Sequence, residues 1–139
     1  MIKVLDMQFI RYVNLFNKIT RIRSNHCFEY NNTIVFAVPR KFVMQAIGKD
    51  NHNLEKLNRL TGKRIKIVAI PQGKEDMESF ISVITKPVRF KGIEINGDEV
   101  SISAGMQSKA ALIGRGKCRL DEMENILGQY FGIRKVRIK

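Results

Sequence analysis

The sequence has no tryptophan, two cysteines, three prolines and two histidines in 139 residues. Cys27 and Cys118 stand far apart and lack the paired spacing of metal ligands, so neither a metal site nor a disulfide framework is expected. No apolar run reaches the roughly 18 residues that a bilayer-spanning helix needs. Residues 1–9 also lack the continuous apolar stretch of a signal peptide. These absences predict a soluble, cytoplasmic protein with reduced cysteines, no cofactor and no membrane partner.

Acidic residues are scarce relative to basic ones. Thirteen Asp and Glu stand against 25 Lys and Arg, which gives a net charge of +12. Ion-pair networks on thermostable surfaces need both signs in comparable numbers, so they do not explain this excess. A one-sided positive charge favours a polyanionic partner, with nucleic acid as the first candidate. The aromatic residues are few and mostly periodic, which argues against the base-stacking platform of an RRM or an OB-fold.

Recognisable catalytic groupings are missing as well. Neither His26 nor His52 lies beside a serine, cysteine or carboxylate arrangement typical of a triad or a metal site. The acidic clusters 75–78 and 121–124 fall in the first turns of predicted helices, where carboxylates complement the helix dipole. A nuclease hypothesis therefore rests on scattered acids alone, and no enzymatic activity is expected.

The first half of the chain alternates between helical and strand patterns. Apolar residues at helical spacing begin near Leu5 and continue to Thr20. Asn31 and Asn32 separate two strand-like runs and predict a tight hairpin turn. The predicted elements are, in order, a helix over 5–20, strands over 27–30 and 33–38, helices over 42–47 and 53–60, and a strand over 63–68.

The same order repeats after a candidate linker at 71–74. The second set comprises a helix over 77–84, strands over 87–95 and 100–103, helices over 106–113 and 118–131, and a strand over 134–139. Ile47-Gly48 and Ile113-Gly114 lie 66 residues apart, and Leu54, Leu57 and Leu60 fall on Leu120, Met123 and Ile126 at that offset. The second half is longer by about one helical turn between its last helix and its last strand, where a connection accommodates extra residues easily. The repeat predicts an α+β chain of two similar domains, 1–72 and 73–139.

Each half joins its two short helices through a similar loop. The segments Ile47-Gly48-Lys49-Asp50-Asn51-His52-Asn53-Leu54 and Ile113-Gly114-Arg115-Gly116-Lys117-Cys118-Arg119-Leu120 share an Ile-Gly-basic start and a closing Leu. Glycine lets the backbone approach phosphates, which helix N-terminal amides and a basic neighbour attract. The alternative is a plain connector, with Gly48 and Gly114 as helix C-caps and Asp50 or Asn51 as an N-cap.

The loop pattern resembles the I-G-x-x-G-x-x-I/L core of KH domains. The element order of each half is similar to the type II KH arrangement, α-β-β-α-α-β with a three-stranded sheet and helices packed on one face. Two such units in a very basic chain resemble the archaeal NusA-like transcription factors, over nearly the whole chain. The resemblance implies that each loop clamps about four nucleotides of single-stranded RNA. The implied RNA-binding residues are Ile47, Gly48, Lys49, Asp50 and Asn51, and then Ile113, Gly114, Arg115, Gly116, Lys117 and Arg119.

Both loops depart from the family pattern at its second glycine, which is Asn51 in one loop and Lys117 in the other. Because Asn tolerates left-handed backbone, the first loop is expected to be closer in shape, although Asp50 puts a carboxylate where phosphate should lie. The second loop is the more basic. The resemblance implies a monomeric RNA-binding protein that controls transcription termination or elongation, with RNA polymerase as a further partner. The alternative is a KH-scaffold interaction protein that docks on RNA polymerase or ribosomal components.

Overall fold

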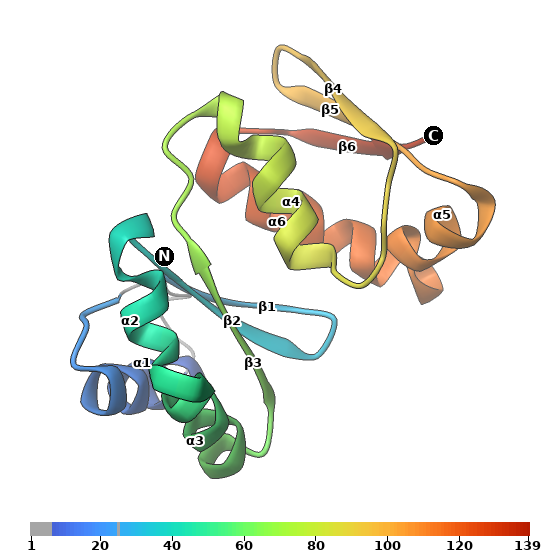
Figure 1. Ribbon diagram of the computed structural model, residues 1–139. Coiled ribbons are helices and arrows are strands. Elements are labelled where there is room, and N and C mark those ends of the chain that lie inside the picture. Colours follow the sequence, from blue (N-terminus) through green and yellow to red (C-terminus); the bar gives the residue numbers. More distant parts are fainter. Residues whose placement is uncertain (1–6, 25) are drawn as a thin grey trace. The chain divides into compact units, whose positions relative to one another are not determined.

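The computed structural model describes residues 7–24 and 26–139. The chain divides between Ile70 and Pro71 into two compact units, here called unit 1 and unit 2 (Figure 1). The described residues form six α-helices and two three-stranded sheets, so the predicted α+β class is confirmed. None of the described helices combines the length and the apolar character needed to cross a bilayer. That each unit is a KH domain, with a boundary after residue 72, stays a prediction.

Unit 1 runs through a helix, two strands, two helices and a final strand. Its elements are α1 (Met7–Thr20), β1 (His26–Tyr30), β2 (Thr33–Val38), α2 (Val43–Ile47), α3 (His52–Thr61) and β3 (Arg64–Ala69). Strand β2 is central, with β1 antiparallel on one side and β3 parallel on the other. The predicted element order is confirmed. The start of the first predicted helix, before Met7, lies outside the described residues.

Local chemistry explains how unit 1 connects its strands. The β1–β2 hairpin turns at Asn31 and Asn32, whose φ angles are 53° and 58°. Two-residue hairpins of this kind need positive φ at both central residues, which Asn adopts more readily than most residues. Strands β2 and β3 are parallel, so the chain must cross over between them, and α2 and α3 supply that crossover.

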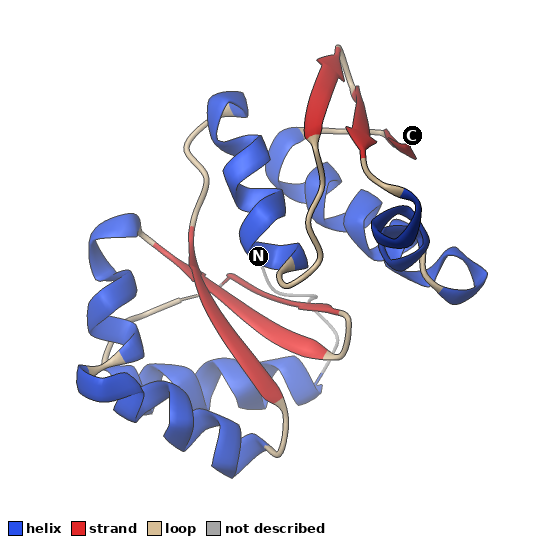
Figure 2. Cartoon of the chain, turned by 45° about the vertical axis from the view of Figure 1, so that its right-hand side comes forward, coloured by secondary structure: helices blue, strands red, loops and turns tan. Residues whose placement is uncertain are grey.

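The core of unit 1 lies between its sheet and its helices. Figure 2 shows the helices of unit 1 on one side of the sheet. Alternate residues of β2 (Ile34, Phe36 and Val38) belong to one buried cluster with side chains of α1, α2 and α3. The fully buried ring of Phe36 stacks on Phe16 of α1, with 4.3 Å between the ring centroids. Because burial of large apolar groups is the main stabilising term, this stack fixes α1 on the sheet.

Unit 2 repeats the order of unit 1. Its elements are α4 (Met77–Thr85), β4 (Gly92–Asn96), β5 (Glu99–Ser103), α5 (Met106–Ile113), α6 (Cys118–Phe131) and β6 (Lys135–Ile138). Strand β5 is central, antiparallel to β4 and parallel to β6. The extra length was predicted between the last helix and the last strand of the second half, but it lies within α6, which has 14 residues where α3 has 10.

The strand predicted over 87–95 is too long. It begins only at Gly92, because residues 85–88 form a turn in which the Val88 amide donates to the Thr85 carbonyl at 2.9 Å. The Lys86–Pro87 peptide bond in this turn is cis. The partner strand β5 has five residues, and all five pair with β4. The apolar residues before Gly92 therefore belong to a loop, although they alternate with polar residues as in a strand.

One hydrogen bond recurs at equivalent positions of the two units. In unit 1 the Asn58 side-chain oxygen accepts from the Ile65 amide at 2.9 Å. In unit 2 a carboxylate oxygen of Glu124, 66 residues after Asn58, accepts from the Val136 amide at 3.0 Å. Each bond ties the last helix of a unit to the start of its outer parallel strand. The bond therefore fixes where that strand lies beside the helix.

Replacing Phe36 by Ala should lower the free energy of unfolding by about 3–5 kcal/mol, because a fully buried aromatic ring is removed. The matched control is Ile10→Ala on α1, where the side chain is 37% exposed and the change should stay within about 0.5 kcal/mol. Urea denaturation measures both variants. Equal losses in the two variants would show that the Phe16–Phe36 stack is not part of the core.

Candidate nucleic-acid interface

Two short loops stand at equivalent places in the units. The first loop, residues 48–51, joins α2 to α3, and the second loop, residues 114–117, joins α5 to α6. Each begins with a glycine in a backbone region that is essentially closed to other residues. Gly48 has φ 84° and ψ 164°, and Gly114 has φ 76° and ψ 169°. The local backbone therefore requires glycine at the first position of both loops.

A lack of space adds to the same requirement. A Cβ atom placed on Gly48 would lie 3.0 Å from the backbone nitrogen of Asn53, and one on Gly114 would lie 2.9 Å from that of Arg119. Real Cβ atoms are seldom found so close to other heavy atoms. Asn53 and Arg119 occupy equivalent positions in the first turns of α3 and α6. The chain thus passes directly against the start of each following helix, with no side chain between.

The next residues give both loops one backbone conformation. Asp50 and Asn51 have φ angles of 53° and 60°, and their equivalents Gly116 and Lys117 have 61° and 65°. Each loop therefore ends in two consecutive left-handed residues. The expectation that the first loop is closer to the family shape is wrong, because Lys117 adopts the same left-handed conformation as Asn51. For a non-glycine residue this conformation costs about 1–2 kcal/mol, with Asn at the lower end.

The connector alternative is confirmed in part, because Asn51 occupies an N-cap position and Gly48 and Gly114 occupy C-caps, although the Asn51 side chain forms no capping hydrogen bond. Asn51 and Lys117 occupy the N-cap positions of α3 and α6, and neither helix start receives a side-chain capping bond. Gly48 and Gly114 do sit at helix C-caps, where their amides donate to the carbonyls of Met44 and Ala110. The first amide of each helix, that of His52 or Cys118, donates to the carbonyl of Lys49 or Arg115, and no side chain at the cap accepts from the amides of the first turn. Such amides, at the positive end of the helix dipole, favour an anion.

Basic side chains flank both loops. Lys49, Arg115 and Lys117 are exposed, and none of them takes part in the ion pairs formed within the described residues. Arg119 differs, because its guanidinium pairs with the Glu122 carboxylate and its side chain is only 18% exposed. Arg119 also packs against Gly114. Its position supports the second loop from beneath, whereas the other three cations face solvent.

The two isoleucines predicted as site residues lie directly before the loops. Ile47 and Ile113, each the last residue of a helix, are partly buried directly before the glycine of each loop. Asn53 was not among the predicted site residues, yet its first-turn position limits the space above Gly48. Asn53 could have been predicted from the repeat, because it lies 66 residues before Arg119, which was a predicted site residue.

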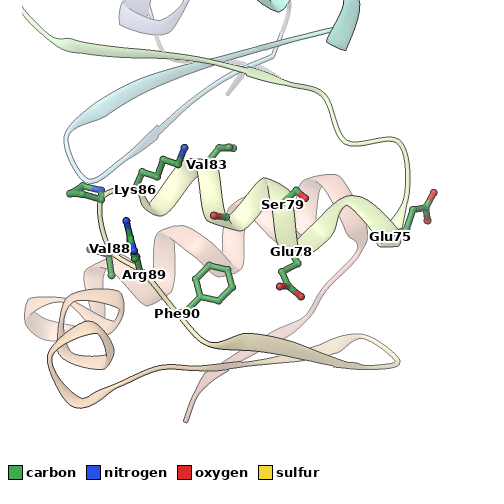
Figure 3. Close-up of a pocket in the computed structure, with 10 residues that line it drawn as sticks. Glu75, Glu78, Ser79, Val83, Lys86, Val88, Arg89 and Phe90 are labelled. Carbon is green, nitrogen blue, oxygen red and sulfur yellow. The ribbon is translucent and has the colours of Figure 1, made fainter.

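Each unit has a hollow that charged residues line, and only the one in unit 1 lies at one of the two loops. One is lined by residues of the first loop and of α3: Gly48, Lys49, Asp50, His52, Asn53 and Glu55. The other lies in unit 2 between α4 and residues 86–90 (Figure 3). Two carboxylates, Glu75 and Glu78, and two cations, Lys86 and Arg89, line it. Because these charges balance, the second hollow offers no net attraction to phosphate.

The described residues offer neither a cluster of metal ligands nor a disulfide at the loops. Among residues 7–24 and 26–139, no three His, Cys, Asp or Glu side chains gather so that they could hold a metal ion. Neither cysteine forms a disulfide, and Cys27 is buried in the core of unit 1 while Cys118 is exposed at the start of α6. What the loops offer is a pair of glycine-bounded turns with exposed cations and helix-start amides. This combination suits a phosphate-bearing chain.

Replacing Lys117 by Gly should raise the free energy of unfolding by about 1 kcal/mol, because glycine adopts the left-handed conformation at φ 65° without a steric penalty. The control is Lys109→Gly at an exposed position inside α5, which should lower the free energy by about 0.5–1 kcal/mol. Urea denaturation at constant salt separates the two. A loss of stability in Lys117→Gly would mean that Lys117 is not left-handed.

Comparison with known proteins supports a NusA-like relationship. No protein-family model matches the chain. The chain is 24% identical over 138 residues to a probable transcription termination protein NusA of Methanococcus vannielii, an alignment that covers 96% of this chain and 78% of the relative. It is also similar to the crystal structure of APE1850, with a TM-score of 0.62 and 25% identity, over 94% of this chain and 96% of that chain. The fold and the sequence are thus similar to these proteins along almost the full length of the chain.

Proposed function

We propose that this protein binds single-stranded RNA through two type II KH domains, one in each unit, and acts in the control of transcription termination or elongation. Three findings support the proposal: the repeated α-β-β-α-α-β order, the net charge of +12, and the similarity to a probable transcription termination protein. The proposed boundary between the domains follows residue 72. Nascent RNA in the cytoplasm is the proposed target, and RNA polymerase is the proposed protein partner of a monomeric chain.

The observation that carries the proposal is the twin loop. In both units a glycine in a glycine-only conformation precedes an exposed basic residue and two left-handed residues at an uncapped helix start. A phosphate in such a loop accepts hydrogen bonds from helix-start amides, while the basic side chain supplies long-range attraction. The nucleobases then point away from the loop and are read individually, as single strands are in KH domains.

The proposed roles differ along each loop. Gly48 and Gly114 let the RNA backbone come close, and Lys49, Arg115 and Lys117 supply charge. Residues Ile47, Asp50, Asn51, Ile113, Gly116 and Arg119 complete the proposed RNA-contacting set. Only binding is required of this set, and the proposal includes no catalytic step.

Fluorescence anisotropy with a mixed-sequence single-stranded RNA, measured across a salt series, tests this function. If the loops together neutralise about six phosphates, the logarithmic salt slope should be roughly −4. The double variant Gly48→Asp/Gly114→Asp should lose most of this binding, because each new side chain fills the space against the helix start and repels phosphate. A wild-type slope near zero would refute the proposal.

The matched control is Gly62→Asp/Gly132→Asp. Both glycines have positive φ, at 68° and 70°, and end α3 and α6 away from the loops, with no heavy atom within 4 Å of an added Cβ. The control introduces the same charge at two glycines outside the loops, whose left-handed conformation other residues tolerate better than the conformation of Gly48 and Gly114, so RNA affinities are compared only between variants that remain folded. Thermal melts of all proteins keep loss of folding separate from loss of binding.

A second function draws support from the first loop, where Asp50 and Glu55 bring two carboxylates to one hollow. Because carboxylates repel phosphate, such a loop suits an interaction protein that binds RNA polymerase or ribosomal components and does not bind RNA. A pull-down after thorough nuclease treatment discriminates the two functions. Recovery of polymerase, together with RNA affinity that is weak and insensitive to the loop variants, would favour docking over RNA binding.

A further inference from the structure

We infer that the two loops divide their work: the second loop is the principal phosphate clamp, and Asp50 makes the first loop a weak one. The inference rests on the proposed RNA-binding function and assigns the main binding site within it. It does not follow from loop shape, because both loops have a glycine at the first position and the same left-handed pair at the third and fourth. The difference between the loops lies in charge.

The equivalent segments 48–55 and 114–121 differ strongly in charge. The first contains one basic residue, Lys49, and two acidic residues, Asp50 and Glu55. The second contains three basic residues, Arg115, Lys117 and Arg119, and one acidic residue, Asp121. Their formal charges are therefore −1 and +2 with His52 neutral. The Arg119 guanidinium is paired with Glu122, so the exposed difference lies in Arg115 and Lys117 against Lys49 and Asp50, and the same phosphate on the same backbone meets more positive charge in unit 2 than in unit 1.

The position of Asp50 makes its effect direct. Asp50 is exposed and lines the hollow at the start of α3, together with Gly48 and Lys49. Asp50 lies in the sequence between Lys49 and the start of α3, so its carboxylate offsets the charge of Lys49 and opposes an anion at that helix start. Coulomb interaction at such short range is only weakly screened at moderate salt. The equivalent residue in unit 2 is Gly116, which adds neither charge nor bulk.

The two loops provide reciprocal substitutions for a test. Asp50→Gly/Asn51→Lys gives the first loop the third and fourth residues of the second, and Gly116→Asp/Lys117→Asn does the reverse. All four positions have positive φ, and an added Cβ on Gly116 meets no heavy atom within 4 Å. The substitutions therefore change charge on a retained backbone. A chain that carries both exchanges keeps the wild-type net charge.

Anisotropy with the same mixed-sequence RNA, measured across the same salt series, tests the inference. The exchange in the second loop should weaken binding about tenfold and reduce the size of the salt slope by roughly 1.4, the value for two lost phosphate contacts. The exchange in the first loop should strengthen binding and steepen the slope. With a wild-type background, Gly114→Asp should weaken binding more than Gly48→Asp, and this order should reverse in the chain that carries both exchanges.

The outcomes separate this inference from the proposed function. If wild-type protein binds RNA with a salt-dependent slope but Gly48→Asp and Gly114→Asp weaken it equally, the division of work is wrong and RNA binding stands. The division of work is also wrong if the exchange in the first loop weakens binding. If wild-type protein shows no salt-dependent binding, both the function and the inference are overturned. Thermal melts of each variant confirm that the compared chains are folded.

Discussion

The site in each unit depends on one steric constraint, the close passage of the loop backbone over the first turn of the following helix. Gly48 and Gly114 meet this constraint through a conformation that other residues do not adopt and through the absence of a Cβ. The constraint sets how α2 meets α3 and how α5 meets α6. Within this turn the first amide of each following helix, that of His52 or Cys118, donates to the carbonyl of Lys49 or Arg115, so the loop backbone and the helix start form one continuous unit.

The sheets hold this arrangement in place. Parallel strands need a crossover, and in each unit the crossover consists of the two helices and the loop between them. Both ends of the crossover are therefore attached to neighbouring strands, while the core beneath it is filled by large side chains such as Phe36 in unit 1. The loop lies in the middle of a segment that cannot move far at either end. This fixed position suits a site that must present several amides at once.

The sequence predicted the features that depend on local chemistry. Apolar spacing located the helices, the Asn31-Asn32 pair located a hairpin, and the offset of 66 residues revealed the repeat. The start of β4 was missed because the residues after Pro87 alternate like a strand, although a turn and the length of β5 exclude them from the sheet. The start of β4 thus depends on tertiary structure, which the spacing of apolar residues does not reveal.

The loops show the same division between local and tertiary information. The charges of both loops were readable from the residues, and so was the requirement for Gly48 and Gly114. The left-handed conformation of Lys117 was not, because the residue type disfavours it and the surrounding helix pair imposes it. The ion pair of Arg119 with Glu122 was missed although it is local, because residues three apart lie on the same face of α6.

The hydrogen bonds from Asn58 and Glu124 to the outer strands have a consequence for association. Strands β3 and β6 are edge strands, and exposed edges present amides on which a strand of another chain can add. At Ile65 and Val136 the amide is already bonded to a side chain of the neighbouring helix. An incoming strand would have to displace that side chain before it could pair there. The contact that positions each edge strand therefore also protects the edge against sheet extension between molecules.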